Sequence, residues 1–139
     1  MAWKCRIPLE PMGKQRPRIA VRGPYAKAYT PTKTMNWEKD AAVVLRAHWR
    51  KAPFSDPTRV VIRAFRSRTQ YMNAKCRRDI STCVSKPDID NIAKIVLDSL
   101  VRAGVIADDN QVVSLECTKQ WAVYGENGFV EVAIESVVD

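Results

Sequence analysis

The chain has 139 residues, of which 46% are hydrophobic and 27% charged, and this composition is typical of a folded globular domain. The length suits one domain with a buried core and is too short for two. No run of 18 apolar residues is present, which excludes a membrane-spanning helix, and the charged first residues lack the apolar core of a signal peptide, so we expect a cytoplasmic protein without a membrane partner.

The net charge of +8 is unevenly distributed along the chain. Residues 1–86 carry 20 Lys and Arg against 5 Asp and Glu, whereas residues 87–139 carry 3 against 10, so the two parts have charges of +15 and −7. A basic region attracts phosphates, but an acidic region in the same small domain would repel them. Carboxylates that hold a divalent cation remove this conflict, because the cation makes them attractive to phosphate. The charge pattern therefore indicates a nucleic-acid-binding protein with a metal site.

The cysteines and the single histidine argue against a structural zinc site. Cys5, Cys76, Cys83 and Cys117 form no C-x-x-C pair, and His48 is the one histidine. Because structural zinc needs four closely spaced nitrogen or sulfur ligands, we expect reduced and mostly buried thiols instead. His48 continues the apolar stripe of a predicted helix, so we interpret it as a residue at the core or its rim.

The first third of the chain reads as short strands separated by turns. We expect a strand over Trp3–Leu9, then a basic loop over Gly13–Arg18 that leads into a second strand, Ile19–Val21. Gly23-Pro24 is a turn signal. Tyr29–Pro31 should be extended, because a residue before proline avoids the α region.

A long helix and a strand follow. Apolar residues at helical spacing predict a helix over Thr34–Arg50, with Thr32 or Thr34 as its N-cap. Alternating residues predict a strand over Arg59–Arg68, whose arginines lie on a solvent edge or face DNA. Thr69–Asp79 is polar and basic and is a candidate helix.

The last third contains a strongly amphipathic segment. It predicts a helix over Asp88–Ala103, with Gly104 as the residue that ends it. Alternating patterns predict strands over Val112–Trp121 and Phe129–Val137. The whole chain, residues 1–139, is therefore expected to form one α+β domain, with a mixed sheet of four or five strands packed against two main helices.

Acidic residues gather around the second helix. Asp88 stands at its start and Asp90 in its first turn, while Asp108 and Asp109 occupy the turn after it. If the next strand packs antiparallel to the helix or crosses its start, the second acidic pair can reach the first. Phosphodiester hydrolysis with Mg²⁺ needs hard oxygen ligands that leave room for water and phosphate. Lys94 would add positive charge at the phosphate.

Each of these residues also has an ordinary structural explanation. Asp88 alone fits a helix cap, and Asp108 and Asp109 fit turn formers. Lys94 fits an i,i+4 ion pair with Asp90, worth a few tenths of a kcal/mol. Together these explanations predict a basic nucleic-acid-binding protein that is not an enzyme.

Two other ligand motifs are excluded by detail. A calcium loop that started at Asp88 would need Gly and Glu where Ala93 and Ser99 stand. No G-x-x-x-x-G-K-[ST] sequence is present, so a nucleotide cofactor bound in that way is not expected.

Several runs of residues, in the same order along the chain, resemble the signature of the RusA family of Holliday-junction resolvases. The central runs are Lys86-Pro87-Asp88-Ile89-Asp90-Asn91-x-x-Lys94-x-x-x-Asp98-x-Leu100 and Ile106-x-Asp108-Asp109-x-Gln111-Val112. The N-terminal runs are Gly13-Lys14-Gln15-Arg16-Pro17-Arg18 and Tyr29-Thr30-Pro31-Thr32-Lys33-Thr34-x-x-Trp37-Glu38. Residues 53–85 carry no motif that aligns with this family.

The resemblance implies a RusA-like fold and a Mg²⁺-dependent, structure-selective DNA endonuclease that resolves Holliday junctions by paired phosphodiester cuts. It implies that Asp88, Asp90 and Asp109 are catalytic carboxylates that bind Mg²⁺ or Mn²⁺ and that Lys94 is a catalytic lysine. We expect Asp108 to support these residues without binding the metal itself. The family resemblance also implies a homodimer, which suits a two-fold symmetric junction because it carries two identical sites. The resemblance also implies that the protein is encoded by a bacterium or a phage.

The basic half of the chain supplies the expected DNA contacts. We predict that Lys14, Arg16, Arg18 and Lys33 bind the phosphates of branched DNA. Contacts of this kind recognise the shape of the DNA rather than its base sequence. Asp98 is expected to matter much less for cleavage than the other aspartates. A nuclease that acts on flaps or forks remains an alternative, because branch selectivity depends on dimer geometry.

Overall fold

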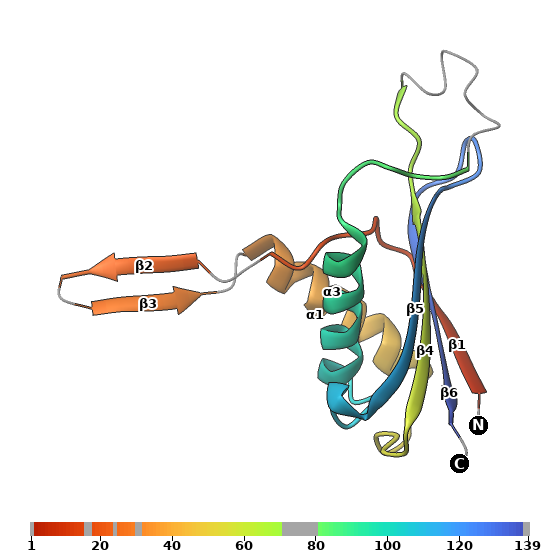
Figure 1. Cartoon of the computed structure of the whole chain (residues 1–139), viewed down its shortest axis with the longest axis horizontal. Coiled ribbons are helices and arrows are strands. Elements are labelled where there is room, and N and C mark those ends of the chain that lie inside the picture. The colour runs from red at the N-terminus through yellow and green to blue at the C-terminus, as the bar shows by residue number, and fades with distance from the viewer. Residues whose placement is uncertain (1, 16–17, 24, 30–31, 71–80, 138–139) are drawn as a thin grey trace.

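The computed structural model describes residues 2–15, 18–23, 25–29, 32–70 and 81–137. Its centre is a four-stranded sheet in the order β1–β6–β4–β5 (Figure 1). The strands are β1 (Ala2–Ile7), β4 (Thr58–Arg66), β5 (Val112–Trp121) and β6 (Phe129–Ser136). β4 pairs in parallel with β5 and antiparallel with β6, and β1 pairs antiparallel with β6. The predicted mixed sheet and α+β class are confirmed.

Two helices, α1 (Thr32–His48) and α3 (Ile89–Arg102), cover one face of this sheet. A separate hairpin of β2 (Arg18–Arg22) and β3 (Tyr25–Tyr29) extends away from the sheet and helices (Figure 1). The turn between them begins at Gly23, whose φ of 60° suits glycine because it has no Cβ. The predicted strand and turn in this region are confirmed.

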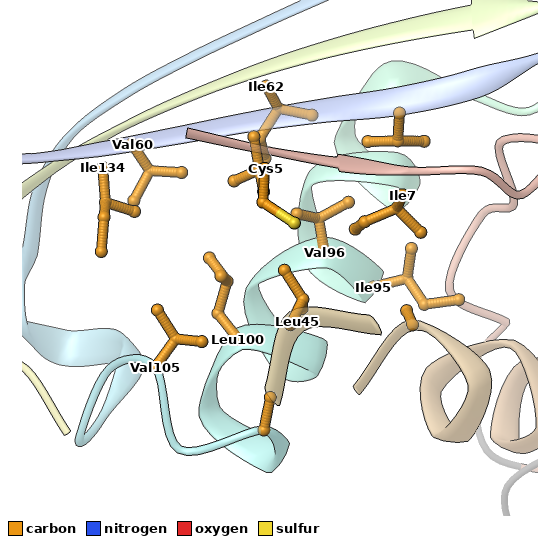
Figure 2. Packing of buried hydrophobic residues seen from close by; sticks show 14 of the residues in the cluster. Cys5, Ile7, Leu45, Val60, Ile62, Ile95, Val96, Leu100, Val105 and Ile134 are labelled. Atoms are coloured by element: carbon orange, nitrogen blue, oxygen red, sulfur yellow. The ribbon is translucent and has the colours of Figure 1, made fainter. Parts of the chain in front are cut away.

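The core lies between the sheet and the two helices (Figure 2). Val60 and Ile62 of β4 point toward it, and Leu45 of α1 and Leu100 of α3 meet them from the helix side. All four side chains are fully buried, and burial of each stabilises the fold by about 1.5–3 kcal/mol. The alternation predicted for β4 is confirmed, so Arg59 and Arg63 lie on the opposite face of the sheet.

The ends of α3 agree closely with those predicted from the sequence, whereas the predicted start of α1 does not. Asp88 is the N-cap of α3, and Gly104, with a φ of 74°, follows its last turn. The N-cap predicted for α1 is wrong, because Thr32 and Thr34 both lie inside that helix. The Oγ1 atom of Thr34 instead accepts a hydrogen bond from the backbone N–H of Gln15, 3.4 Å away.

The described cysteines behave as the sequence predicts, whereas the interpretation of His48 as a residue of the core or its rim is wrong. Cys5 and Cys83 are free and buried, Cys117 is free and half-buried, and Cys76 lies outside the described residues. Burial raises the pKa of Cys117 to about 11, so its thiol is protonated at neutral pH. His48 is exposed at the end of α1, with Nδ1 2.9 Å from the carbonyl oxygen of Val44.

The described residues address two further expectations only in part. Most of the candidate helix over Thr69–Asp79 lies outside them. Within them, no helix is long and apolar enough to cross a membrane.

Candidate active site

The exposed start of α3 presents two carboxylates. Asp88 has the extended backbone of an N-cap, yet its side chain makes no capping hydrogen bond. Asp90, two residues later, is also exposed, and its Oδ1 atom accepts a hydrogen bond from the Asn91 N–H at 3.0 Å. Asp88 therefore occupies the predicted N-cap position without a capping hydrogen bond from its side chain, and its exposed oxygens remain accessible to a ligand.

The segment before α3 is anchored from β5 and from the N-terminal loop. The ammonium group of Lys119 donates hydrogen bonds to the carbonyl oxygens of Ser85 and Pro87, at 2.9 and 3.1 Å. The N–H of Lys14 donates to the carbonyl oxygen of Asn91 at 2.8 Å. A Cβ on Gly13 would lie only 3.0 Å from the Cβ of Asn91, so glycine permits this close approach. These contacts fix the position of the acidic turn.

Lys94 lies between two carboxylates. Its Nζ atom is 3.1 Å from Oδ1 of Asp98 and 3.6 Å from Oδ2 of Asp109. The hydrogen bond to Asp98 is the main cause that raises the pKa of Lys94 above its ordinary value, so the side chain is a cation at neutral pH. The described residues show no ion pair between Lys94 and Asp90, the partner considered from the sequence. Asp98 takes that place because it lies one turn later on the same helical face.

The turn after α3 is shaped by Asp108, while Asp109 carries the exposed carboxylate. Asp108 caps the short 3-10 helix Asp109–Gln111, and its Oδ1 accepts from the Asn110 N–H at 3.0 Å. This hydrogen bond is the main cause that lowers the pKa of Asp108. The side-chain amide of Gln111 donates to the carbonyl oxygen of Phe54 at 2.8 Å, which ties the turn to the segment before β4. Asp108 thus holds the turn that brings Asp109 to Lys94.

A charged network continues from Lys94 into the protein. Lys14 forms ion pairs with Glu38 and with Oδ2 of Asp98, the latter at 3.2 Å. Arg102 approaches Glu38 from the other side, at 3.7 Å. Burial alone would lower the pKa of Lys14, but its hydrogen bonds to the two carboxylates raise it overall. The network lines a hollow of about 400 Å³ that also reaches Asp108 and Asp109.

Sequence reasoning did not single out Glu38, although its pattern carried a signal. Glu38 stands on the same helical stripe as the buried Trp37, Ala41 and Leu45, and it is itself only 7% exposed. A carboxylate on an apolar stripe requires a cation beside it, because an unpaired buried charge is costly. Lys14 and Arg102 supply that charge.

The structure does not gather the three proposed metal ligands. β5 runs antiparallel to α3 (Figure 1), so the turn that precedes β5 lies beside the later part of the helix. The side chain of Lys94 reaches Asp109, whereas Asp88 and Asp90 stand at the helix start. Among the described residues, no three His, Cys, Asp or Glu side chains are grouped so that they could hold a metal ion.

Two carboxylates are nevertheless a suitable donor set for magnesium. Mg²⁺ is usually held by one or two carboxylates, while waters and substrate phosphates complete its shell. Asp88 and Asp90 supply hard oxygen atoms that are exposed to solvent and carry no ion pair within the described residues. Their chemistry fits a divalent cation at the start of α3.

The predicted DNA contacts have different surroundings. The side chain of Lys14 is directed into the charged network, with 20% of it exposed. Lys33 is exposed in the first turn of α1. Arg18 begins β2, but its side chain, like the whole of Arg16, lies outside the described residues.

Exposed carboxylates and a cationic lysine on a basic α+β domain are typical of enzymes that hydrolyse phosphodiesters with metal ions. The chain belongs to the family described as Endodeoxyribonuclease RusA, whose model matches residues 8–135. This membership implies a DNA nuclease, as the sequence motifs indicate. The chain is also 28% identical over 134 residues to the "Uncharacterized protein YqaN" of Bacillus subtilis (strain 168), with 92% of each chain covered.

Proposed function

We propose that this protein is a Mg²⁺-dependent endonuclease that resolves four-way DNA junctions by paired cuts, acting as a homodimer. Family membership supports DNA cleavage. The observation that supports the finer proposal is the position of Lys94. This lysine lies on the same helix as Asp88 and Asp90, and its ammonium group contacts both Asp98 and Asp109. A lysine fixed in this way offers a defined positive charge on the same helix as two accessible carboxylates.

In the proposed mechanism, Asp88 and Asp90 hold the metal ion at the start of α3. A bound Mg²⁺ supplies an activated water and neutralises charge that develops on the phosphate. Lys94 provides a second, preorganised positive charge for the same phosphate, and Asp98 keeps its ammonium group in place. Asp109 is proposed as the third catalytic carboxylate, and Asn substitution tests its role separately from that of Asp88 and Asp90.

The dimer follows from the symmetry of the substrate. A four-way junction has two equivalent strands to cut, and a C2 dimer carries two identical sites in matching geometry. Contacts to phosphates rather than bases would select the shape of the junction.

Incubation with synthetic DNA tests this function. The substrates are a four-way junction, a flap, a fork and a linear duplex of matched sequence, each with Mg²⁺ and with EDTA. We expect symmetric cuts in the junction only when Mg²⁺ is present. Preferential cutting of the flap or fork would show that this DNA, rather than the four-way junction, is the substrate. Binding without any cutting would show that the protein is not a nuclease.

A further inference from the structure

A groove rich in positive charge runs along the outer side of α1 to the end of α3. It has a volume of about 950 Å³, and four of its eight lining residues are basic: Lys39, Arg46, Arg50 and Arg102. None of the eight is acidic. We call this feature the α1 groove. It shares only Arg102 with the network around Glu38, and sequence reasoning assigned no role to any of its four cations.

The cations of the α1 groove differ in the hydrogen bonds and ion pairs that they form within the protein. Arg46 donates hydrogen bonds to the carbonyl oxygens of Trp49 and Lys51, at 3.4 and 3.2 Å, and so closes the end of α1. Arg102 pairs with Glu38. Lys39 and Arg50 are exposed, and within the described residues neither forms an ion pair, although the Nε of Arg50 donates a hydrogen bond to the carbonyl oxygen of Ala47 at 3.4 Å. These two side chains are therefore available to an anionic partner.

The α1 groove opens beside the proposed active site. Arg102 lines both this groove and the hollow that contains Asp98 and Asp109. An extended anion that lies in the groove would therefore continue toward Lys94, which contacts both of these carboxylates.

The spacing of the cations suits a polymer of phosphates rather than a single anion. A helix rises about 1.5 Å per residue, so Lys39 stands about 14 Å before His48, the last residue of α1, and Arg50 follows two residues beyond the helix. One strand of duplex DNA carries a charge roughly every 3.4 Å along its axis, so this distance spans several phosphates. A single phosphate or carboxylate would reach only one of the two side chains.

We infer that the α1 groove binds the phosphate backbone of a duplex arm of the DNA substrate and directs that arm toward Lys94. This inference rests on the proposed function, because it takes DNA as the substrate. It adds a DNA-binding surface on α1 to the contacts predicted for the N-terminal basic loop.

The test compares two double variants with the same loss of charge. Lys39→Gln/Arg50→Gln removes the two unpaired cations of the α1 groove. Lys4→Gln/Arg6→Gln removes two exposed cations of β1 that lie on the sheet face away from the helices. All four side chains are exposed, so both variants should fold, and thermal unfolding curves check this. Binding of a fluorescent four-way junction is measured in Ca²⁺ between 50 and 200 mM salt.

For the groove variant we expect junction affinity to fall by about tenfold or more at 100 mM salt. The slope of log affinity against log salt should become flatter by about two units, because two phosphate contacts are lost. The control variant should bind as the wild type does. An equal loss in both variants would assign the effect to net charge and overturn the inference, as would wild-type affinity in the groove variant.

Failure of the inference can be separated from failure of the proposed function. The wild-type protein is assayed for junction cleavage in Mg²⁺ alongside the binding series. If it cuts junctions while the groove variant binds normally, only the α1 groove assignment is wrong. If the wild type neither binds nor cuts DNA, both proposals fail together.

Discussion

The carboxylate of Asp98 lies one helical turn after Lys94, and its Oδ1 atom is 3.1 Å from the lysine Nζ atom. Its other oxygen is 3.2 Å from the Nζ atom of Lys14. Asp98 therefore joins the proposed catalytic lysine to the half-buried network behind it. The sequence predicts a minor role for Asp98, because its motif position suggests only an exposed helix residue. The geometry instead gives it a positioning role.

Asp98→Asn should change the pH dependence of cleavage. Hydrogen bonding to Asp98 raises the pKa of Lys94, so loss of the carboxylate should lower that pKa. Lys94 is charged below its pKa, and the alkaline limb of the rate–pH profile should therefore move to lower pH. Cleavage rates measured from pH 7 to 11 check this shift. Glu126→Gln, an exposed change in the turn before β6, is the control, and an unchanged profile in Asp98→Asn would exclude the positioning role.

Lys94→Ala should reduce the single-turnover cleavage rate by about 10²–10³-fold, the usual effect of losing one preorganised electrostatic contact in catalysis. An ordinary surface ion pair would cost only a few tenths of a kcal/mol of stability. Lys4→Ala, on exposed β1, serves as the control. Normal turnover with a slightly lower melting temperature would support the purely structural interpretation of Lys94.

Asp88→Asn, Asp90→Asn and Asp109→Asn should each abolish cutting while junction binding stays intact or becomes tighter. The substitution is nearly isosteric and removes a negative charge, so it should not weaken contacts to phosphate. Cleavage in Mg²⁺ and junction binding in Ca²⁺ are measured for each variant, together with Mn²⁺ affinity by calorimetry. Wild-type cutting by Asp90→Asn would show that the proposed site is wrong.

The Mn²⁺ measurement separates the roles of the aspartates. We expect Asp88→Asn and Asp90→Asn to weaken Mn²⁺ binding, because these two carboxylates are the proposed ligands at the start of α3. If Asp109→Asn loses cutting but keeps wild-type Mn²⁺ affinity, Asp109 acts through Lys94, its observed partner, rather than as a metal ligand.

Local patterns in the sequence predict the elements well but not how distant elements meet. The bounds of α3 and β5 agree with the prediction to within one residue, because amphipathic spacing, the cap and Gly104 are local signals. The sequence suggests that a strand antiparallel to α3 would let Asp109 reach Asp88. A strand antiparallel to the preceding helix instead begins near the end of that helix, and in the structure the carboxylate of Asp109 pairs with the long side chain of Lys94.

The role of Lys14 shows the same limit for the site. Charge along the sequence predicts a phosphate contact, whereas the structure pairs its ammonium group with Glu38 and Asp98. The position of Glu38 on the apolar stripe of α1 indicates a buried partner, but a stripe does not identify which cation reaches it. Only the fold brings the N-terminal loop against both helices.

Glu38→Ala should therefore destabilise the protein by about 2–4 kcal/mol, because it leaves Lys14 and Arg102 without their shared carboxylate. Glu126→Ala, on the exposed turn, should change the free energy of unfolding by less than about 0.5 kcal/mol. Urea unfolding at neutral pH measures both values. A loss in Glu38→Ala as small as that of the control would show that the network adds little to stability.

Lys14→Gln then distinguishes an internal ion pair from a DNA contact. The folded pKa of Lys14 is raised above 10.5, so its ion pairs stabilise the fold below that pH, and this stabilisation is lost as pH rises through the folded pKa. We expect Lys14→Gln to have a lower free energy of unfolding than the wild type at pH 7. This difference in the free energy of unfolding should become smaller at high pH. The salt dependence of junction binding should stay unchanged. A slope flatter by about one unit, with wild-type stability, would instead make Lys14 a phosphate contact, as its charge alone suggests.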